Sequence, residues 1–134
     1  PPETGDEGYR LVFEEVVVPL ADAFRPELVL ISAGYDPHFA DPMSGMLVTA
    51  AGFRTLTELA VAAAGRGEGR VVAVLEGGYD LPGLSTSVVA TLEVLAQRTA
   101  RTTLPDHRFE EVPYPVIRER IRRARSVALN YWRI

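Results

Sequence analysis

Two loops of this sequence hold the side chains best suited to chemistry. Residues 32–43 include Asp36, His38 and Asp41, and residues 75–81 include Tyr79 directly after two glycines. Each loop follows a short apolar run that is typical of a buried strand. Ligands of open parallel sheets bind beyond the carboxyl ends of the strands, so the sequence predicts one site built from both loops.

Each of these residues also has a structural interpretation. Asp36 and Asp41 could close turns through hydrogen bonds to the backbone. Tyr79 could be a half-buried aromatic residue with a satisfied hydroxyl, and His38 an ordinary loop histidine. The glycine pair, Gly77 and Gly78, fits either a tight turn or a close backbone approach to a ligand.

The elements that position the loops alternate between helices and strands. Apolar spacing predicts a helix from Asp6, which we expect to cap it, to a stop at Pro26, with Pro19 kinking or unwinding it. Further helices are expected from Thr49 to about Ala64 and from about residue 82 to Gln97. Between them, residues 28–31 and 71–75 are predicted as strands buried on both faces. This order predicts a parallel sheet with helical crossovers, and two strands alone indicate a piece of a larger α/β domain.

The C-terminal part is predicted to be a connection followed by one helix. Residues 98–113 show little periodicity, and a helix from about Pro115 has one apolar side formed by Ile117, Ile121, Ala124, Val127 and Ala128. Tyr131, Trp132 and Ile134 are expected to dock on the body of the protein. The arginines clustered in this helix favour a solvated face over a phosphate site; they are Arg118, Arg120, Arg122, Arg123 and Arg125.

Composition narrows the function classes. The chain has 134 residues, no cysteine, a net charge of −4 and 47% hydrophobic residues, which is typical of a globular protein without disulfides or thiolate metal ligands. The negative charge argues against direct nucleic-acid binding, and no apolar stretch is long enough to cross a membrane. We expect a cytoplasmic protein of bacterial type. The chain begins with Pro1 and has no signal sequence, which indicates a processed chain or a fragment.

The two loops together resemble the histone deacetylase superfamily, in particular its class II and bacterial branch. The resemblance rests on residues 26–36 (PELVLISAGYD), on Asp41-Pro42 and on residues 74–79 (VLEGGY) followed by a helix. It covers residues 2 to 97. It implies an arginase/deacetylase-like α/β fold, an open and mostly parallel sheet with helices on both faces. Residues 1–97 would be the C-terminal part of the catalytic domain, and residues 98–134 a connection and a helix packed on it.

The resemblance also implies roles for individual residues. Asp36 would be one of three zinc ligands, and Tyr79 would donate a hydrogen bond to the substrate carbonyl and the developing oxyanion. Met43, with Gly77 and Gly78, would line the substrate tunnel, and Asp41 would organise its loop. The implied reaction is hydrolysis of an N-acetyl amide, with acetyl-lysine or an acetylated polyamine as substrate.

The remaining family ligands and the paired histidines would lie upstream of this chain. Its two histidines, His38 and His107, match neither position. Since a catalytic zinc needs about three protein ligands, the isolated chain is expected to be inactive. The alternative is a non-catalytic, deacetylase-like binding module. A nucleotide-binding α/β domain is disfavoured, because no phosphate-binding glycine pattern follows either strand. The sequence leaves the oligomeric state open.

Overall fold

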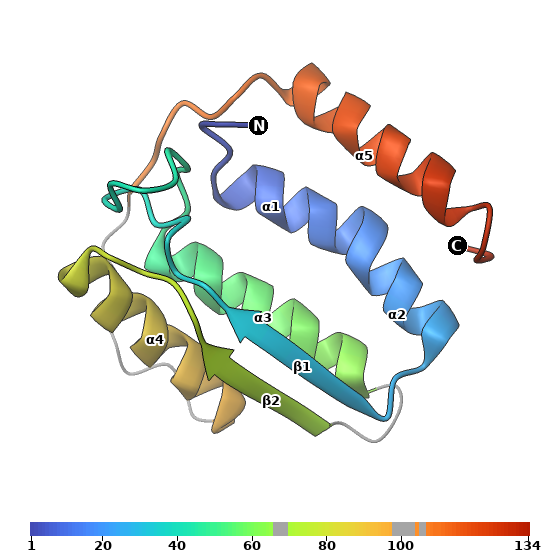
Figure 1. Cartoon of the computed structure of the whole chain (residues 1–134), viewed down its shortest axis with the longest axis horizontal. Helices are drawn as coiled ribbons and strands as arrows, with labels where there is room; N and C mark the ends of the chain where they lie inside the picture. Colours follow the sequence, from blue (N-terminus) through green and yellow to red (C-terminus); the bar gives the residue numbers. More distant parts are fainter. Residues whose placement is uncertain (66–69, 98–103, 105–106) are drawn as a thin grey trace.

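A computed structural model describes residues 1–65, 70–97, 104 and 107–134 of the chain. The elements, in chain order, are helix α1 (Asp6–Val12), a π-helix η1 (Phe13–Val17), helix α2 (Val18–Phe24), strand β1 (Leu28–Ala33), helix α3 (Ala50–Gly65), strand β2 (Arg70–Leu75), helix α4 (Leu81–Leu95) and helix α5 (Tyr114–Ala128) (Figure 1). The fold is α/β, as predicted.

The N-terminal helix changes its winding next to Pro19. The π-helical turn η1 lies just before this proline, which has no amide hydrogen to give to the carbonyl of Glu15. That carbonyl accepts instead from the Arg125 guanidinium of α5 (Nη1···O 3.3 Å). The predicted local unwinding at Pro19 is therefore confirmed, and a distant arginine occupies the acceptor that it leaves.

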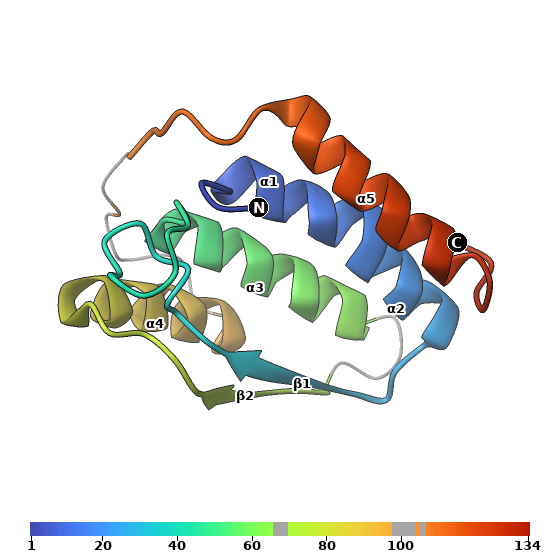
Figure 2. The same ribbon diagram turned by 45° about the horizontal axis from the view of Figure 1, so that its top comes forward.

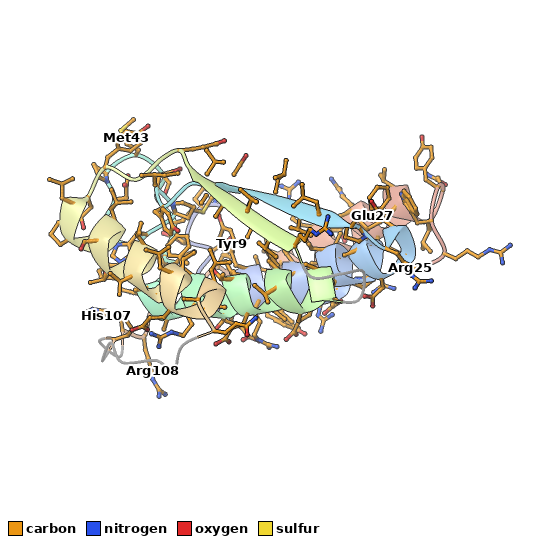
Figure 3. All side chains as sticks on the ribbon, turned by 90° about the horizontal axis from the view of Figure 1, so that it is seen from below. Tyr9, Arg25, Glu27, Met43, His107 and Arg108 are labelled. Carbon is orange, nitrogen blue, oxygen red and sulfur yellow. The ribbon has the colours of Figure 1, made fainter. Side chains whose placement is uncertain are left out.

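The two strands pair in parallel, as the crossover pattern predicted. Leu28 lies opposite Arg70 and Ala33 opposite Leu75, so the carboxyl ends of both strands point to the same edge (Figure 1). Viewed from below, the strands lie on one side of the molecule and the helices on the other (Figure 3). The prediction that both faces are buried is wrong for this chain: Leu30 is 69% exposed and Val74 58% exposed, because no described helix covers their face.

The core under the sheet lies between the strands and helices α1, α3 and α4. Its buried residues are Ala33, Tyr35, Val48 and Phe53, with Leu84 and Val88 of α4 packed against them. An apolar hollow of about 430 Å³ remains between β1 and the helices, lined among others by Phe13, Val29 and Leu56. Such a space leaves part of the core without packing partners among the described residues.

Helix α5 runs alongside α1 and α2 (Figure 2). Ile117 and Ile121 are buried against Leu11 and Val16. The apolar face is narrower than predicted, since Val127 is 60% exposed and Ala124 is exposed too.

The arginines of α5 pair with carboxylates, as a solvated helix face would. Arg118 pairs with Glu15, and Arg122 and Arg123 share Glu119. After the helix, Trp132 meets Phe24 edge-on, with 5.8 Å between ring centroids. The prediction that Tyr131 docks on the body of the protein is wrong, since its side chain is 79% exposed.

The predicted connection is only partly visible. Residues 98–103 and 105–106 lie outside the described residues, and residues 107–113 form no helix or strand. In the described part of the chain, no helix has the length and apolar character needed to span a membrane.

Candidate active site

The two loops that follow β1 and β2 lie side by side. Beyond the strand pairing, Glu76 donates its amide hydrogen to Ala33 (N···O 3.0 Å) and Tyr35 donates to Gly77 (2.9 Å). These bonds extend the parallel ladder into the loops. The loops meet at the carboxyl edge of the sheet, where a site was predicted.

The Asp36 side chain lies against the glycine backbone of both loops. A Cβ atom at Gly77 would fall 2.3 Å from Asp36 Oδ1, and one at Gly34 would fall 3.0 Å from it. Glycine is therefore required at position 77 for Asp36 to keep its place. Within the described part of the chain the Asp36 carboxylate accepts no hydrogen bond, while its backbone carbonyl accepts from Ser44 Oγ (2.5 Å).

Asp41 ties the two loops together from a buried position. Its Oδ2 accepts the amide hydrogens of Tyr79 (2.6 Å) and Asp80 (3.2 Å), and its Oδ1 accepts that of Met43 (2.9 Å). Burial by itself raises the pKa of Asp41, but the three amide donors outweigh it and hold this pKa below its ordinary value. The lowered pKa favours the charged carboxylate, whose three hydrogen bonds hold the two loops together.

The backbones of Tyr79 and Met43 are bonded to Asp41, while the side chains of both residues extend into solvent. Tyr79 is 63% exposed and Met43 70% exposed, and Figure 3 places Met43 at the strand side of the molecule. The Tyr79 hydroxyl makes no hydrogen bond to any described residue. Gly78 precedes it with φ +130°, and a Cβ there would fall 2.8 Å from Leu84. Both the backbone conformation and the space require glycine at position 78.

Neither histidine joins this group. His38 is buried, with Nδ1 accepting the Ala40 amide hydrogen (3.3 Å), and it packs against Gly83 of α4. Burial lowers the pKa of His38 below its ordinary value and outweighs the nearby carboxylates, which favours the neutral ring at neutral pH. His107 is exposed and lies on Phe39, with 4.7 Å between ring centroids.

Several residues of the site's surroundings were not predicted. Tyr9 of α1 lies near Asp36, and burial together with that carboxylate raises the Tyr9 pKa. Asp80 caps α4 by accepting from Gly83 (2.8 Å), and the Asp-Leu-Pro sequence was a signal for this cap. Glu111, whose carboxylate caps α1, has no sequence signal at all.

The prediction that Asp6 caps its own helix is wrong. Asp6 is the first helical residue, and its carboxylate reaches across to accept from Thr49 N (2.7 Å) and Thr49 Oγ1 (2.6 Å). Thr49 in turn caps α3 by accepting from Gly52 (3.1 Å). Asp6 therefore joins the starts of two helices.

The carboxylate of Asp36 has the chemistry of a metal ligand. Asp36 offers a carboxylate that no described residue engages, which is what a metal ligand requires. The described residues contain no group of three or more histidine, cysteine or acidic side chains placed to hold a metal ion. Asp36 therefore fits the role of one metal ligand, and a catalytic zinc site would need two more from outside these residues.

The chain is similar to proteins that are named as deacetylases. Residues 1–95 match the family model described as the histone deacetylase domain. The chain is 36% identical to a probable deacetylase of Archaeoglobus fulgidus over 99% of its length and 40% of the relative's. It is 39% identical to the polyamine deacetylase HDAC10 of Homo sapiens, over 96% of the chain and 18% of that protein. It superposes on the crystal structure of the HDA15 HD domain with a TM-score of 0.82 and 30% identity, covering 98% of the chain and 34% of that structure. The chain therefore spans less than half of each of these proteins.

Proposed function

The chain belongs to the histone deacetylase family, and from this we propose that it is the C-terminal portion of a zinc-dependent deacetylase that hydrolyses an N-acetyl amide. The proposed substrates are acetyl-lysine or acetylated polyamines. The human relative is named a polyamine deacetylase, which supports the second class.

The observation that carries the proposal is the pairing of Asp36 and Tyr79 across two loops. Asp36 lies against Gly77, with its carboxylate free for a metal. Two residues further along that second loop, Tyr79 presents a free hydroxyl, and Asp41 fixes its backbone. A ligand and a neutral hydrogen-bond donor at one sheet edge are two of the parts that zinc-assisted amide hydrolysis needs.

In this mechanism Asp36 would be one of the residues that hold the zinc. When bound, zinc supplies a Lewis acid that polarises a carbonyl and a water whose pKa is lowered to about 7. Tyr79 donates its hydroxyl hydrogen to the amide carbonyl oxygen, and the bond strengthens as that oxygen gains negative charge. Asp41 keeps this donor in place through the backbone, and the exposed Met43 side chain contacts the aliphatic part of the substrate.

Three features support a larger enzyme around this chain. The outer sheet face is exposed at Leu30, Val72 and Val74, the hollow beneath β1 is unfilled, and the described residues offer one metal ligand. Further segments would cover the sheet and supply the other ligands, so we expect the isolated chain to be inactive. Residues 1–97 would be part of the catalytic domain, and residues 98–134 a connection and docking helix.

The proposal is tested by comparing the 134-residue chain with a protein that carries additional sequence upstream of Pro1. Zinc content and acetyl-lysine hydrolysis are measured for both. The expected result is one zinc and turnover in the longer protein only. A longer protein without zinc and without turnover would overturn the proposal and favour the non-catalytic binding module.

A further inference from the structure

The segment that follows the family-matched residues returns to the loop that carries Asp36. His107 and Phe109 both lie on the ring of Phe39, with centroid distances of 4.7 and 4.8 Å. Further along, Val112 donates its amide hydrogen to Glu3 (N···O 3.0 Å). The tail therefore touches both the candidate site loop and the N-terminal segment.

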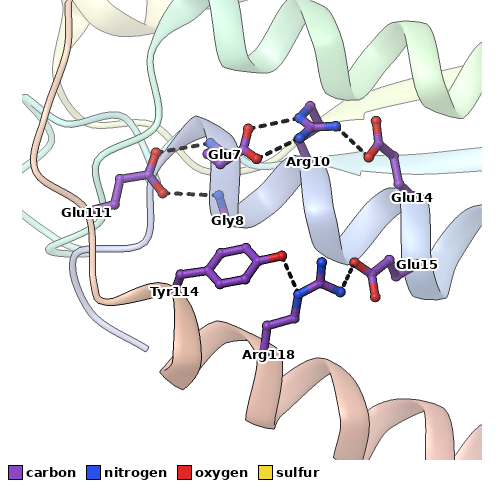
Figure 4. Close-up of polar contacts among 8 residues, drawn as sticks. All are labelled: Glu7, Gly8, Arg10, Glu14, Glu15, Glu111, Tyr114 and Arg118. Carbon is purple, nitrogen blue, oxygen red and sulfur yellow. Dashed lines mark hydrogen bonds and ion pairs between the residues drawn. The ribbon is translucent and has the colours of Figure 1, made fainter.

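Between these contacts, Glu111 caps the first helix. Its Oε2 accepts the amide hydrogens of Gly5 (2.9 Å) and Gly8 (3.0 Å), and its Oε1 accepts that of Glu7 (3.0 Å). Figure 4 shows the bonds to Glu7 and Gly8. The cap position itself provides no side-chain cap, because it is Gly5. A Cβ at Gly5 would fall 2.7 Å from the Glu111 carboxyl carbon, so the absent side chain makes room for the distant carboxylate.

The start of α1 is also bonded to the end of the loop of residues 35–49, which carries Asp36. Asp6 accepts two hydrogen bonds from Thr49, at the end of the loop. Glu3 donates its amide hydrogen to Gly45 (2.9 Å), and Leu47 donates to Thr4 (3.0 Å). The segment of residues 3–8 is thus bonded to Glu111 through Gly5, Glu7 and Gly8, and to residues 45–49 through Glu3, Thr4 and Asp6.

We propose that Glu111 is a positioning residue for the loop of residues 35–49. By fixing the start of α1, its carboxylate fixes the backbone that is bonded to residues 45–49, at the end of the loop that carries Asp36, Asp41 and Met43. This gives the segment beyond the family-matched domain a part in organising the site. The structural claim concerns the loop alone, and its catalytic meaning rests on the proposed function.

Hydrogen exchange of the 134-residue chain tests the claim without any activity. The readout is the exchange of the Met43 and Tyr79 amides, which donate to Asp41 and not to Glu111. Glu111→Ala is expected to speed their exchange by about tenfold or more, the equivalent of losing one charge-assisted hydrogen bond. Glu111→Gln keeps one acceptor oxygen and should fall in between. If the alanine variant does not fold, Glu111→Gln alone provides the test.

The matched control is Glu110→Ala, which removes the same charge at the neighbouring position. The Glu110 side chain is exposed. It should leave the Met43 and Tyr79 amides at the wild-type rate. The proposal is overturned if both glutamine and alanine at position 111 speed exchange only at Gly5, Glu7 and Gly8, since the cap would then act on its own helix alone.

The same variants in the longer protein separate this proposal from the proposed function. If deacetylation occurs, Glu111→Gln should lower kcat and zinc retention, whereas Glu110→Ala should change neither. If the loop loosens in the exchange experiment but the longer protein never hydrolyses acetyl-lysine, the positioning role stands and the proposed function fails. If the protein is active and loop exchange is unchanged, the positioning role fails.

Discussion

The carboxylate of Asp41 accepts the backbone amide hydrogen of Tyr79 at 2.6 Å, which joins the loop after β1 to the loop after β2. The two residues are far apart in sequence, and the bond fixes the backbone of the proposed hydrogen-bond donor, leaving its ring exposed. Asp41 belongs to the same loop as Asp36. One buried carboxylate therefore helps to set how the loop of Asp36 and the loop of Tyr79 lie relative to each other.

Replacing Asp41 should destabilise the chain as well as the site. Asp41→Ala leaves three amide donors without their acceptor, and a loss of about 2 to 4 kcal/mol in the free energy of unfolding is expected. Asp41→Asn retains one oxygen acceptor and should lose less. Urea unfolding of both variants measures this loss. A loss under about 0.5 kcal/mol for the alanine variant would contradict a stabilising role of the three Asp41 hydrogen bonds.

Substituting the glycines around Asp36 should give a graded series. Gly77→Ala places a Cβ 2.3 Å from Asp36 Oδ1 and should displace the carboxylate, whereas Gly34→Ala, at 3.0 Å, should have a smaller effect. Gly65→Ala is the control, since a Cβ there meets nothing within 4 Å. Zinc content of the longer protein is the measurement, with the order 77, then 34, then 65 from largest loss to none. Equal zinc content in all three would exclude Asp36 as a ligand held by this backbone.

The local patterns of the sequence predicted the elements well. Apolar spacing and breakers placed α3 and β2 within a residue or two, and the unwinding at Pro19 followed from the missing amide hydrogen. The burial of the strands was predicted less well. A continuous apolar run such as residues 28–31 indicates two covered faces, but the described residues cover only one, so Leu30 is left exposed.

The candidate site shows a similar division. The motifs placed Asp36, Asp41 and Tyr79 at one sheet edge, because strand ends of a parallel sheet converge. The supporting bonds could not be predicted, since they join residues that are distant in sequence and have no motif spacing. Asp6 was assigned to its own helix and instead bonds Thr49, and Glu111 caps a helix 106 residues upstream at Gly5.

Acidification should destabilise the chain through His38. The folded protein holds the ring neutral by burial, so its pKa is lower than in the unfolded chain. As pH falls below about 6.5, the unfolded state takes up the proton first, and stability falls until the folded ring also protonates. His38→Asn keeps an acceptor for the Ala40 amide and should flatten this dependence in urea unfolding between about pH 7.5 and 5.

The control for this experiment is His107→Asn, which leaves His38 in place and should keep the wild-type dependence on pH. A His38→Asn protein with an unchanged pH dependence would show that other groups cause it.

The docking of α5 should depend on its two buried isoleucines. Ile121 is 2% exposed between α5 and the N-terminal helix, so Ile121→Ala should lower the free energy of unfolding by about 2 to 4 kcal/mol. Val127→Ala, on the same helix but 60% exposed, should change it by less than about 0.5 kcal/mol. Similar losses for the two variants in urea unfolding would mean that α5 is not docked on this face.

The most direct test of the central claim is the turnover of Tyr79→Phe in the longer protein, with zinc content measured on the same sample. The change removes one hydroxyl from an exposed ring and leaves the Asp41 bond to the backbone of residue 79 in place. We predict unchanged zinc content and a kcat lowered by about a hundred- to a thousandfold, the usual effect of losing one oxyanion donor. Turnover at the wild-type rate would contradict the role of Tyr79 and, with it, the assignment of this sheet edge as a deacetylase site.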